Sequence, residues 1–379
     1  MIAKYPDLRD FLQGLKTEAS PREVLGKFSP LYAYTDIIDF NNVHTIHPNI
    51  AAPTPTTTPT TIGTPLEDSL LFITGGDTSW GFLPSTEVYP RTSGCSPPPL
   101  PLDRYGHMTF MTSEPTPLVA ACGGSNIRGS FASCLVLDQI NQRWDENRMG
   151  NLTTVRIKGA AATLNDIGVF IVGGGTGNPH NRGTSEFLAA GTMQWQEGPG
   201  LPVNMYSPCA VSITSTSFIT IYATNIWEFD TATAGPTSRE GWREAGHWPE
   251  LKTLRTGWPG CAKIGQKVII AGGHNGEELS STEVLDLVDR RISSEGEMAS
   301  PRRWFHLATI ISGGEEKMFA LAGYYEPKGY YNGNYLNTVE EWVETNSTWK
   351  AADNLIERRH MFGAVAVPKH LICPLNIVG

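Results

Sequence analysis

The stretch Lys267–Asp286, KVIIAGGHNGEELSSTEVLD, predicts the fold of this 379-residue chain. Four apolar residues, Val268–Ala271, lead into the pair Gly272 and Gly273, a polar loop follows, and a second strand begins at Thr282. Such a unit is too small to fold alone, because one face of a small sheet stays apolar and needs a neighbour. We therefore expect the chain to repeat it.

Apolar runs that end in a glycine pair, or in a diverged form of one, recur along the chain. They occupy 71–76 (LFITGG), 118–124 (LVAACGG), 169–174 (VFIVGG), 218–223 (FITIYA), 268–273 (VIIAGG) and 318–323 (MFALAG). The run ends are roughly 48 to 50 residues apart, close to the longest period associated with propeller blades. This series predicts a repeat architecture.

Each unit is expected to hold four strands. The second strand carries a glutamate in five of the six units, and Leu135 takes that place in the other. These glutamates are Glu87, Glu186, Glu228, Glu283 and Glu340, and the third strand often contains a tryptophan (Trp144, Trp195, Trp242, Trp349). The fourth strand follows a turn that carries Arg or Pro, in the runs 104–110, 157–164, 207–213, 258–264, 304–311 and 360–367.

With these features in this order, residues 70–367 resemble the kelch repeat family. The departures are Tyr222-Ala223 and Ala322-Gly323 in place of glycine pairs, and Leu135 in place of Glu. The resemblance implies an all-β kelch propeller of six four-stranded blades, with seven as the alternative. Counting strands predicts that 360–367 becomes the innermost strand of the blade containing 71–76, so that the C-terminal strand closes the ring.

Four segments are expected in the chain. Residues 1–51 form an N-terminal extension that is partly helical, and 52–69 form a linker rich in Pro and Thr. The propeller spans 70–370, and 371–379 form a C-terminal tail. In the seven-bladed alternative, 35–39 would join a blade with 360–373.

Composition excludes several classes of function. The 40% hydrophobic and 18% charged residues, with 39 Gly and 27 Pro, suit a globular protein of many short strands and turns. A net charge of -9 argues against nucleic-acid binding. No run of about 18 apolar residues occurs, so no membrane span is expected. Charges at Asp7, Arg9 and Asp10 interrupt any secretory signal, which favours the cytoplasm, with an extracellular location as the alternative.

The six cysteines show no spacing typical of a zinc site. Cys122 and Cys134 end two consecutive strands, where a cross-strand disulfide is geometrically allowed, with buried free thiols as the other interpretation. The sequons at Asn151 and Asn346 agree with an extracellular location.

No set of residues in the sequence specifies a catalytic centre. Neither a Gly-x-Ser-x-Gly elbow nor a Gly-Lys-Ser/Thr phosphate loop occurs. Some kelch propellers are copper oxidases of the galactose-oxidase type, but no spacing selects a ligand set here. We therefore expect no enzyme activity, no cofactor and no metal.

Loops after the glycine pairs and turns before the fourth strands should open on one face of the ring. This face collects Arg, Tyr and Trp, the residues enriched in interface hot spots. The expected binding residues are Trp80, Arg104, Arg128, Arg156, Arg182, Tyr206, Arg255, Trp258, His274, Arg302, Arg303, Tyr324, Tyr325 and Arg358. The other interpretation is that the arginines belong to the repeat and pair locally.

The sequence therefore predicts a noncatalytic protein-interaction scaffold that binds an acidic or aromatic peptide. The alternatives are an extracellular propeller that binds carbohydrate or matrix, and a metal-dependent oxidase on the same scaffold.

Overall fold

The fold is described from a computed structural model. It describes residues 67–112, 117–175, 182–243, 246–327 and 333–373. The chain divides into two compact units, 1–62 and 63–379, and every described residue lies in the second. The expected N-terminal helical segment, the strand at 31–40 and most of the linker lie outside the described residues.

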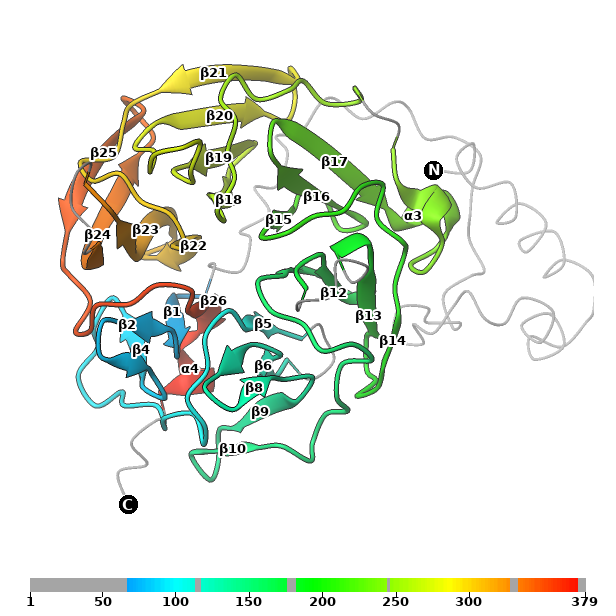
Figure 1. Ribbon diagram of the computed structural model, residues 1–379, viewed down its shortest axis with the longest axis vertical. Coiled ribbons are helices and arrows are strands. Elements are labelled where there is room, and N and C mark those ends of the chain that lie inside the picture. Colours follow the sequence, from blue (N-terminus) through cyan, green and yellow to red (C-terminus); the bar gives the residue numbers. More distant parts are fainter. Residues whose placement is uncertain (1–66, 113–116, 176–181, 244–245, 328–332, 374–379) are drawn as a thin grey trace, which may run out of the picture. The chain divides into compact units, whose positions relative to one another are not determined.

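Six antiparallel sheets follow one another around a ring as the blades of a β-propeller (Figure 1). The strands of each blade are given from the axis outward. Blade 1 contains β26 (Gly363–Pro368), β1 (Ser69–Thr74) and β4 (Thr86–Tyr89). Blade 2 contains β5 (Met108–Met111), β6 (Val119–Cys122), β9 (Cys134–Asp138) and β10 (Arg143–Asp145), and blade 3 contains β11 (Ala160–Leu164), β12 (Gly168–Val172), β13 (Ser185–Ala189) and β14 (Trp195–Glu197).

Blade 4 contains β15 (Cys209–Ser212), β16 (Ser217–Tyr222) and β17 (Asn225–Asp230); blade 5 contains β18 (Gly260–Ile264), β19 (Lys267–Ala271), β20 (Thr282–Asp286) and β21 (Arg291–Glu295); blade 6 contains β22 (His306–Ser312), β23 (Glu315–Tyr325), β24 (Asn334–Val343) and β25 (Thr348–Ala352). The loops carry the hairpins β2 (Asp77–Thr78) with β3 (Gly81–Phe82) and β7 (Ser125–Asn126) with β8 (Gly129–Ser130), the short helices α3 (Thr231–Ala234) and α4 (Lys369–Ile372), and the 3-10 turn η4 (Arg239–Gly241).

The expected all-β six-bladed fold is confirmed, with one correction. In the described part of the chain, blades 1 and 4 have three strands rather than four. In blade 4 the predicted third strand is reduced to one isolated bridge between Phe229 and Trp242, because α3 and η4 interrupt the return of the chain. In blade 1 the segment after β4 is rich in proline, which cannot donate to a strand ladder.

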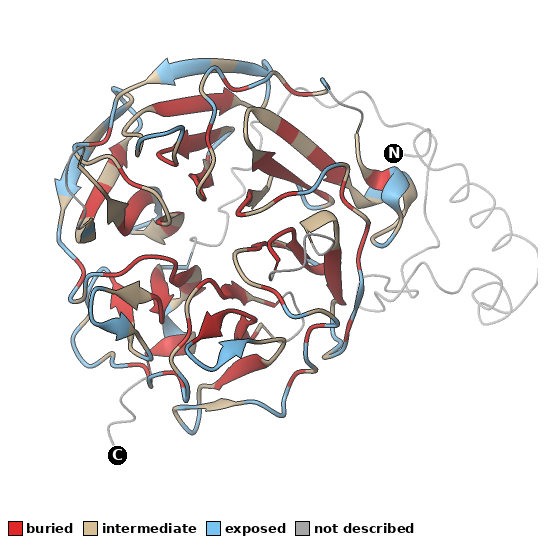
Figure 2. Ribbon diagram, viewed as in Figure 1, coloured by how far each residue is buried: buried red, intermediate tan, exposed pale blue. Residues whose placement is uncertain are grey.

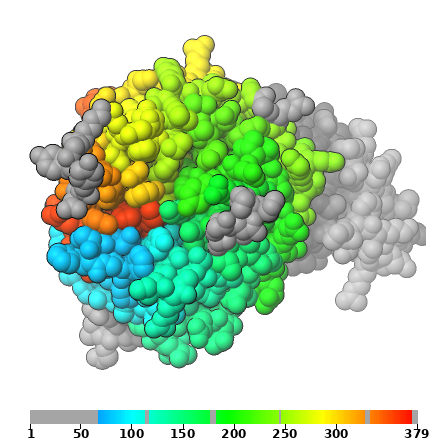
Figure 3. All heavy atoms as spheres, in the orientation of Figure 1, coloured from blue at the N-terminus to red at the C-terminus, as the bar shows by residue number. Residues whose placement is uncertain are grey.

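Blade 1 combines residues from both ends of the described chain. β26 pairs antiparallel with β1 along six residue pairs, from Ser69 with Pro368 to Thr74 with Gly363. With all atoms drawn, the C-terminal residues in red adjoin the blue residues of blade 1 (Figure 3). The strand that begins the propeller and the strand that ends it therefore share one sheet.

The apolar core lies between neighbouring blades. The middle strands are apolar on both faces, as in β19, whose residues Val268–Ala271 are fully buried. One cluster joins Ile269 of blade 5 to Met318 of blade 6, and the edge strands β21 and β25 are largely exposed (Figure 2). Each blade thus covers the apolar face of the next, which explains why a single unit could not fold alone.

The second glycine of each pair connects one blade to the next. Its N–H donates to the carbonyl of the residue four positions before the next innermost strand, as from Gly76 to Arg104 and from Gly323 to Arg359. At Gly76, φ is +109° and an added Cβ would meet Phe362 Cβ at 2.9 Å. Glycine is required here by the left-handed backbone and by the close approach of the turn before β26.

Four blades contain a buried ion pair between the arginine before the innermost strand and the glutamate of the third strand from the axis. The pairs are Arg156–Glu186 (3.3 Å), Arg255–Glu283 (3.1 Å), Arg302–Glu340 (2.5 Å) and Arg359–Glu87 (2.9 Å). The same guanidinium groups donate to backbone carbonyls at the glycine turn, for example from Arg255 to Gly272. In these four blades the recurring arginine and glutamate therefore fix the position of the glycine turn.

All six cysteines are paired in disulfides. Cys122–Cys134 joins two strands of blade 2, the cross-strand pair that the sequence allowed. Cys209–Cys261 joins blades 4 and 5, and Cys95–Cys373 joins the loop after β4 to the end of α4, 278 residues away in sequence.

Among the described residues, no helix is long and apolar enough to span a membrane.

Candidate functional site

A ring of six residues surrounds the axis, one from each blade, just before the innermost strand. These residues, the annulus, are Gly106, Lys158, Ser207, Gly257, Trp304 and Met361, and all have φ between 50° and 66°. Backbone N–H groups donate to the neighbouring carbonyl at five of the six junctions, for example from Lys158 to Gly106 and from Met361 to Trp304 (2.7 and 2.9 Å). The annulus therefore holds its side chains in fixed positions around the axis.

Aromatic side chains of blades 1 and 6 gather beside the annulus. Trp304 stacks on His360 with ring centroids 5.2 Å apart, and Tyr324 lies 5.5 Å from both rings. Tyr335 packs against Tyr324 at 5.4 Å and against His360 at 4.9 Å. The β23–β24 hairpin positions both tyrosines, and the turn before β26 positions His360. The result is a continuous aromatic surface beside the axis.

Two cations connect this surface to blade 3. The ammonium group of Lys158 lies 5.5 Å from the Trp304 ring and 5.4 Å from the Tyr206 ring, and the Arg182 guanidinium lies 4.9 Å from the same Tyr206 ring. Blades 3 and 6 are opposite each other in a ring of six, so Lys158 reaches across the axis. Among the described residues, neither Lys158 nor Arg182 has a carboxylate within ion-pair distance.

We call these residues the mouth cluster: Lys158, Arg182, Tyr206, Arg303, Trp304, Tyr324, Tyr335 and His360. The remaining cation, Arg303, lies 4.0 Å from the Trp304 ring, but Glu278 compensates its charge at 3.1 Å. Burial lowers the pKa of His360, and the charges of Lys158 and Arg303 lower it further, against the opposing effect of Asp77 at 3.4 Å. The uncompensated positive charge of the mouth cluster therefore resides on Lys158 and Arg182.

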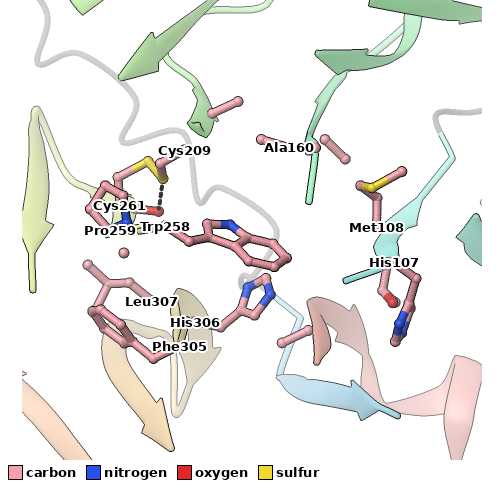
Figure 4. Close-up of a pocket in the computed structure, with 16 residues that line it drawn as sticks. His107, Met108, Ala160, Cys209, Trp258, Pro259, Cys261, Phe305, His306 and Leu307 are labelled. Atoms are coloured by element: carbon pink, nitrogen blue, oxygen red, sulfur yellow. Dashed lines mark hydrogen bonds between the residues drawn. A yellow bond between two sulfur atoms is a disulfide. The ribbon is translucent and has the colours of Figure 1, made fainter. Parts of the chain in front are cut away.

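A cavity of about 140 Å³ lies on the axis, next to the annulus, and the innermost strands of all six blades line it. Figure 4 shows the Trp258 indole beside the His306 ring, the Cys209–Cys261 disulfide on one side and His107 on the other. Much of the remaining wall is small residues such as Gly159 and Ala160, which leave the space open.

The two histidines of this cavity are held neutral. Burial lowers the pKa of His306 to about 4 and that of His107 well below its ordinary value. Nε2 of His107 hydrogen-bonds Thr74 Oγ1 at 2.8 Å, and the His306 ring hydrogen-bonds the Phe362 backbone. Nδ1 of His107 and Nε2 of His306 are buried with no hydrogen-bond partner among the described residues. A buried imidazole nitrogen without a hydrogen-bond partner is energetically costly.

Four of the expected binding residues are not on the surface. Arg104, Arg156, Arg255 and Arg302 are at most 1% exposed, so the expectation that they contact a partner is corrected. Their role is internal, because each guanidinium donates to carbonyls inside its own blade. Trp258 is also buried, at 6% exposure, and its indole lines the axial cavity rather than the outer face.

The structure assembles four of the expected residues in the mouth cluster, namely Arg182, Tyr206, Arg303 and Tyr324. Trp80 and Arg128 lie at the tips of the β2–β3 and β7–β8 hairpins, and the Trp80 side chain is 96% exposed. His274 accepts a hydrogen bond from the Gly276 N–H, Tyr325 is half-buried in β23, and Arg358 is exposed before β26.

Sequence reasoning missed Lys158, Trp304 and His360 as members of a site. Each occupies a turn position whose residue type varies from blade to blade, so no recurring residue type identifies the position. The available signal was its place relative to the arginine: Lys158 and Trp304 both lie two residues after a buried arginine.

Comparison of the sequence with protein-family models and with curated proteins finds no match. Among the described residues, no group of three or more His, Cys, Asp or Glu side chains is arranged to hold a metal ion.

Proposed function

We propose that this propeller is a noncatalytic interaction module of the kelch type, and that its mouth cluster binds an acidic segment of a partner protein. The kelch assignment is supported by the left-handed glycine pairs, the recurring glutamate and the arginine before five of the six innermost strands. These features form one repeated structural unit, with diverged forms in blades 2 and 4.

One observation carries the functional part: Lys158 and Arg182 lie over aromatic rings without a carboxylate partner among the described residues. The chain as a whole carries a net charge of -9, yet these two cations lie together over the Tyr206 ring. An aspartate or glutamate side chain would supply the missing charge, and Tyr206 and Trp304 would contact its apolar neighbours. Charge complementarity of this kind gives specificity and speeds association.

The proposal is tested with a fluorescent peptide array in which the number of Asp, Glu and aromatic residues varies. We expect the full chain to select peptides that combine acidic and aromatic residues. Arg182→Glu and Lys158→Glu should each weaken that binding by about tenfold or more, because each replaces attraction by repulsion. Lys350→Glu, on the outermost strand β25, is the matched control. Equal binding of basic and acidic peptides, or equal loss in the control, would contradict the proposal.

A second proposal concerns compartment and follows from the cysteines. All three disulfides are of the kind that persists in an oxidising environment, which favours an extracellular or lumenal propeller over a cytoplasmic one. The sequon residues Asn151 and Asn346 are both exposed, which agrees with this location. Mass analysis of the protein from its native source, with and without reductant and glycosidase, tests it. Six free thiols and no glycan would contradict it.

A further inference from the structure

Beyond the peptide site at the mouth cluster, we propose that the β2–β3 and β7–β8 hairpins insert their tips into the headgroup region of an anionic lipid bilayer. The apolar tip residues are Trp80 and Ile127, and the neighbouring cation is Arg128. Four features of the hairpins support this inference: the exposure of the tips, their shared position, their charge and the small area they offer.

The two tips present large apolar side chains to solvent. Trp80 is 96% exposed and Ile127 is 88% exposed. Each lies in the turn of a short hairpin that stands outside the blade sheets. Neither side chain is buried by the fold, so neither stabilises the propeller through the hydrophobic effect.

Tyr105 connects the two hairpins. Its backbone pairs with Ser125 of β7, and its ring stacks on Phe82 of β3 with centroids 4.7 Å apart. Each hairpin follows the second strand from the axis, in the adjoining blades 1 and 2, so both open on the same face of the ring (Figure 1). Single exposed apolar residues are common on proteins, but two on adjoining hairpins form one protruding surface.

Hydrogen bonds hold both tips in shape. Thr78 Oγ1 accepts from the Trp80 N–H at 3.1 Å and donates to the Gly81 carbonyl at 3.0 Å. In the second hairpin, Asn126 Oδ1 accepts from the Arg128 N–H at 2.8 Å. Because the tips are already ordered, their insertion costs little conformational entropy.

The charge of the tips suits an anionic surface. Residues 78–82 and 126–130 contain a single charged side chain, Arg128, and no carboxylate. At the bases of the hairpins, Asp77 lies 3.4 Å from His360, and Asp103 accepts a hydrogen bond from Asn126. Tryptophan is enriched at membrane interfaces, and arginine is attracted to anionic headgroups. On a chain of net charge -9, Arg128 therefore favours an orientation with the tips toward the lipid.

The small area of this surface favours a bilayer over a folded protein. An aromatic side chain buries about 150 to 250 Å², so the two tips together offer roughly 300 to 400 Å². A stable protein interface needs about 800 Å² on each partner and a complementary shape. A lipid interface has no fixed shape, so two protruding side chains insert without a matching pocket.

The probe is flotation of the full chain with vesicles of phosphatidylcholine containing about 30% phosphatidylserine, and with vesicles of phosphatidylcholine alone. We expect half of the protein or more to float at about 1 mM anionic lipid, and several-fold less with the neutral vesicles. No flotation with either vesicle would leave the tips to a protein partner and overturn the proposal. Equal flotation with both would contradict the role of Arg128.

Variants locate the contact, with the thermal midpoint measured in parallel. Trp80→Ser should weaken vesicle binding about tenfold and Ile127→Ser about fivefold, because each removes an inserted apolar side chain. Ile140→Ser is the matched control, since Ile140 is 93% exposed on the turn between β9 and β10, at the other end of β9 from the hairpin β7–β8. Equal binding in all three variants would overturn the proposal.

Brominated lipid identifies the side chain that inserts. Vesicles with bromine on the acyl chains should quench part of the fluorescence of the ten tryptophans. Trp80→Phe should keep binding within about threefold of the parent, because phenylalanine also inserts, and should lose that quenching. Unchanged quenching in Trp80→Phe would place another tryptophan at the lipid and overturn the proposal.

The mouth cluster provides the remaining comparison. Arg182→Glu should lose the acidic peptide and keep vesicle binding within about threefold, whereas Trp80→Ser should lose vesicle binding and keep the peptide. Loss of vesicle binding in Arg182→Glu, with unchanged binding in Trp80→Ser, would assign the lipid contact to the mouth cluster and overturn the proposal.

Discussion

Arg302 and Glu340 show how the repeat arginines stabilise a blade. The Arg302 side chain is fully buried, and it donates to Glu340 and to the carbonyls of Ala322 and Thr338. Burying two charges is costly, and their mutual attraction offsets that cost only while both are present. Removing one partner leaves an uncompensated charge in the interior.

In two blades an apolar residue replaces one partner of this pair. In blade 2 Leu135 replaces the glutamate, so Arg104 donates only to backbone carbonyls, and burial lowers its pKa to about 10. In blade 4 Met205 occupies the arginine position, and its carbonyl accepts the usual hydrogen bond from Gly174. An apolar residue is therefore tolerated at either position of the pair.

We expect Arg302→Met to destabilise the propeller by about 3 to 5 kcal/mol, because Glu340 then stays buried without a counter-charge. The double variant Arg302→Met with Glu340→Leu should lose clearly less than Arg302→Met alone, since it removes both charges. Urea denaturation followed by tryptophan fluorescence measures both. A double variant less stable than the single variant would contradict the account of the pair.

His306 predicts a dependence of stability on pH. In the folded chain burial lowers its pKa from 6.5 to about 4, so the unfolded chain binds the proton first as the pH falls. Its contribution is complete above pH 6.5 and is lost between about 6.5 and 4. The free energy of unfolding should fall by about 3 kcal/mol from this residue alone.

The comparison with His306→Gln isolates that contribution, because all other groups titrate in both proteins. We expect the variant to lose less stability than the parent between pH 7 and pH 4. An identical loss in both proteins would show that His306 does not titrate differently in the folded and unfolded chains.

At this scale the sequence predicted types of residue better than their positions. The recurring arginines were expected either at the outer face or in local pairs, and four of them form local pairs. The glutamates that pair with them were interpreted only as strand contacts. Both patterns have the same period, and the exceptions at Leu135 and Met205 fall in different blades. The mouth residue Lys158 could not be predicted, because its position holds Gly, Ser, Trp or Met in the other blades.

At the scale of the elements, the disulfide next to the C-terminal strand joins the two cysteines that are farthest apart in sequence. The Cys95–Cys373 disulfide holds the end of α4, four residues after β26, against the loop that follows β4. Cys122–Cys134 is a natural comparison, because it joins neighbouring strands only 12 residues apart. In the chain-entropy description, a disulfide that closes a longer loop restricts the unfolded chain more.

Cys373→Ser should therefore destabilise the propeller by about 5 kcal/mol and Cys134→Ser by about 3 kcal/mol, from the two loop lengths. Thermal unfolding of both variants under the same oxidising conditions measures the difference. A larger loss in Cys134→Ser would contradict the role given to the long disulfide.

The strands and turns were largely predictable, because the apolar runs and glycine turns recur in the sequence at the repeat period. The third strands of blades 1 and 4 were not. Trp242 matched the tryptophan pattern, but in the structure it forms one isolated bridge to Phe229. The 52-residue separation of Cys209 and Cys261 is about one repeat, which is the spacing that places two cysteines at matching positions of neighbouring blades.

At the scale of the whole molecule, the site depends on both ends of the propeller. His360 precedes β26, whereas Trp304 and Tyr324 belong to blade 6, and Asp77, which lies beside His360, belongs to blade 1. We propose that the pairing of β26 with β1 closes the ring and so holds His360 of the mouth cluster beside Trp304 and Tyr324.

Hydrogen exchange on a chain that lacks residues 356–379 tests this central claim most directly, with the full chain as the control. If β26 closes the ring, every blade should lose protection together, because removing one strand opens two junctions at once. Loss of protection in β1 and β4 alone, with β12, β19 and β23 protected as in the full chain, would contradict closure and with it the assembly of the site.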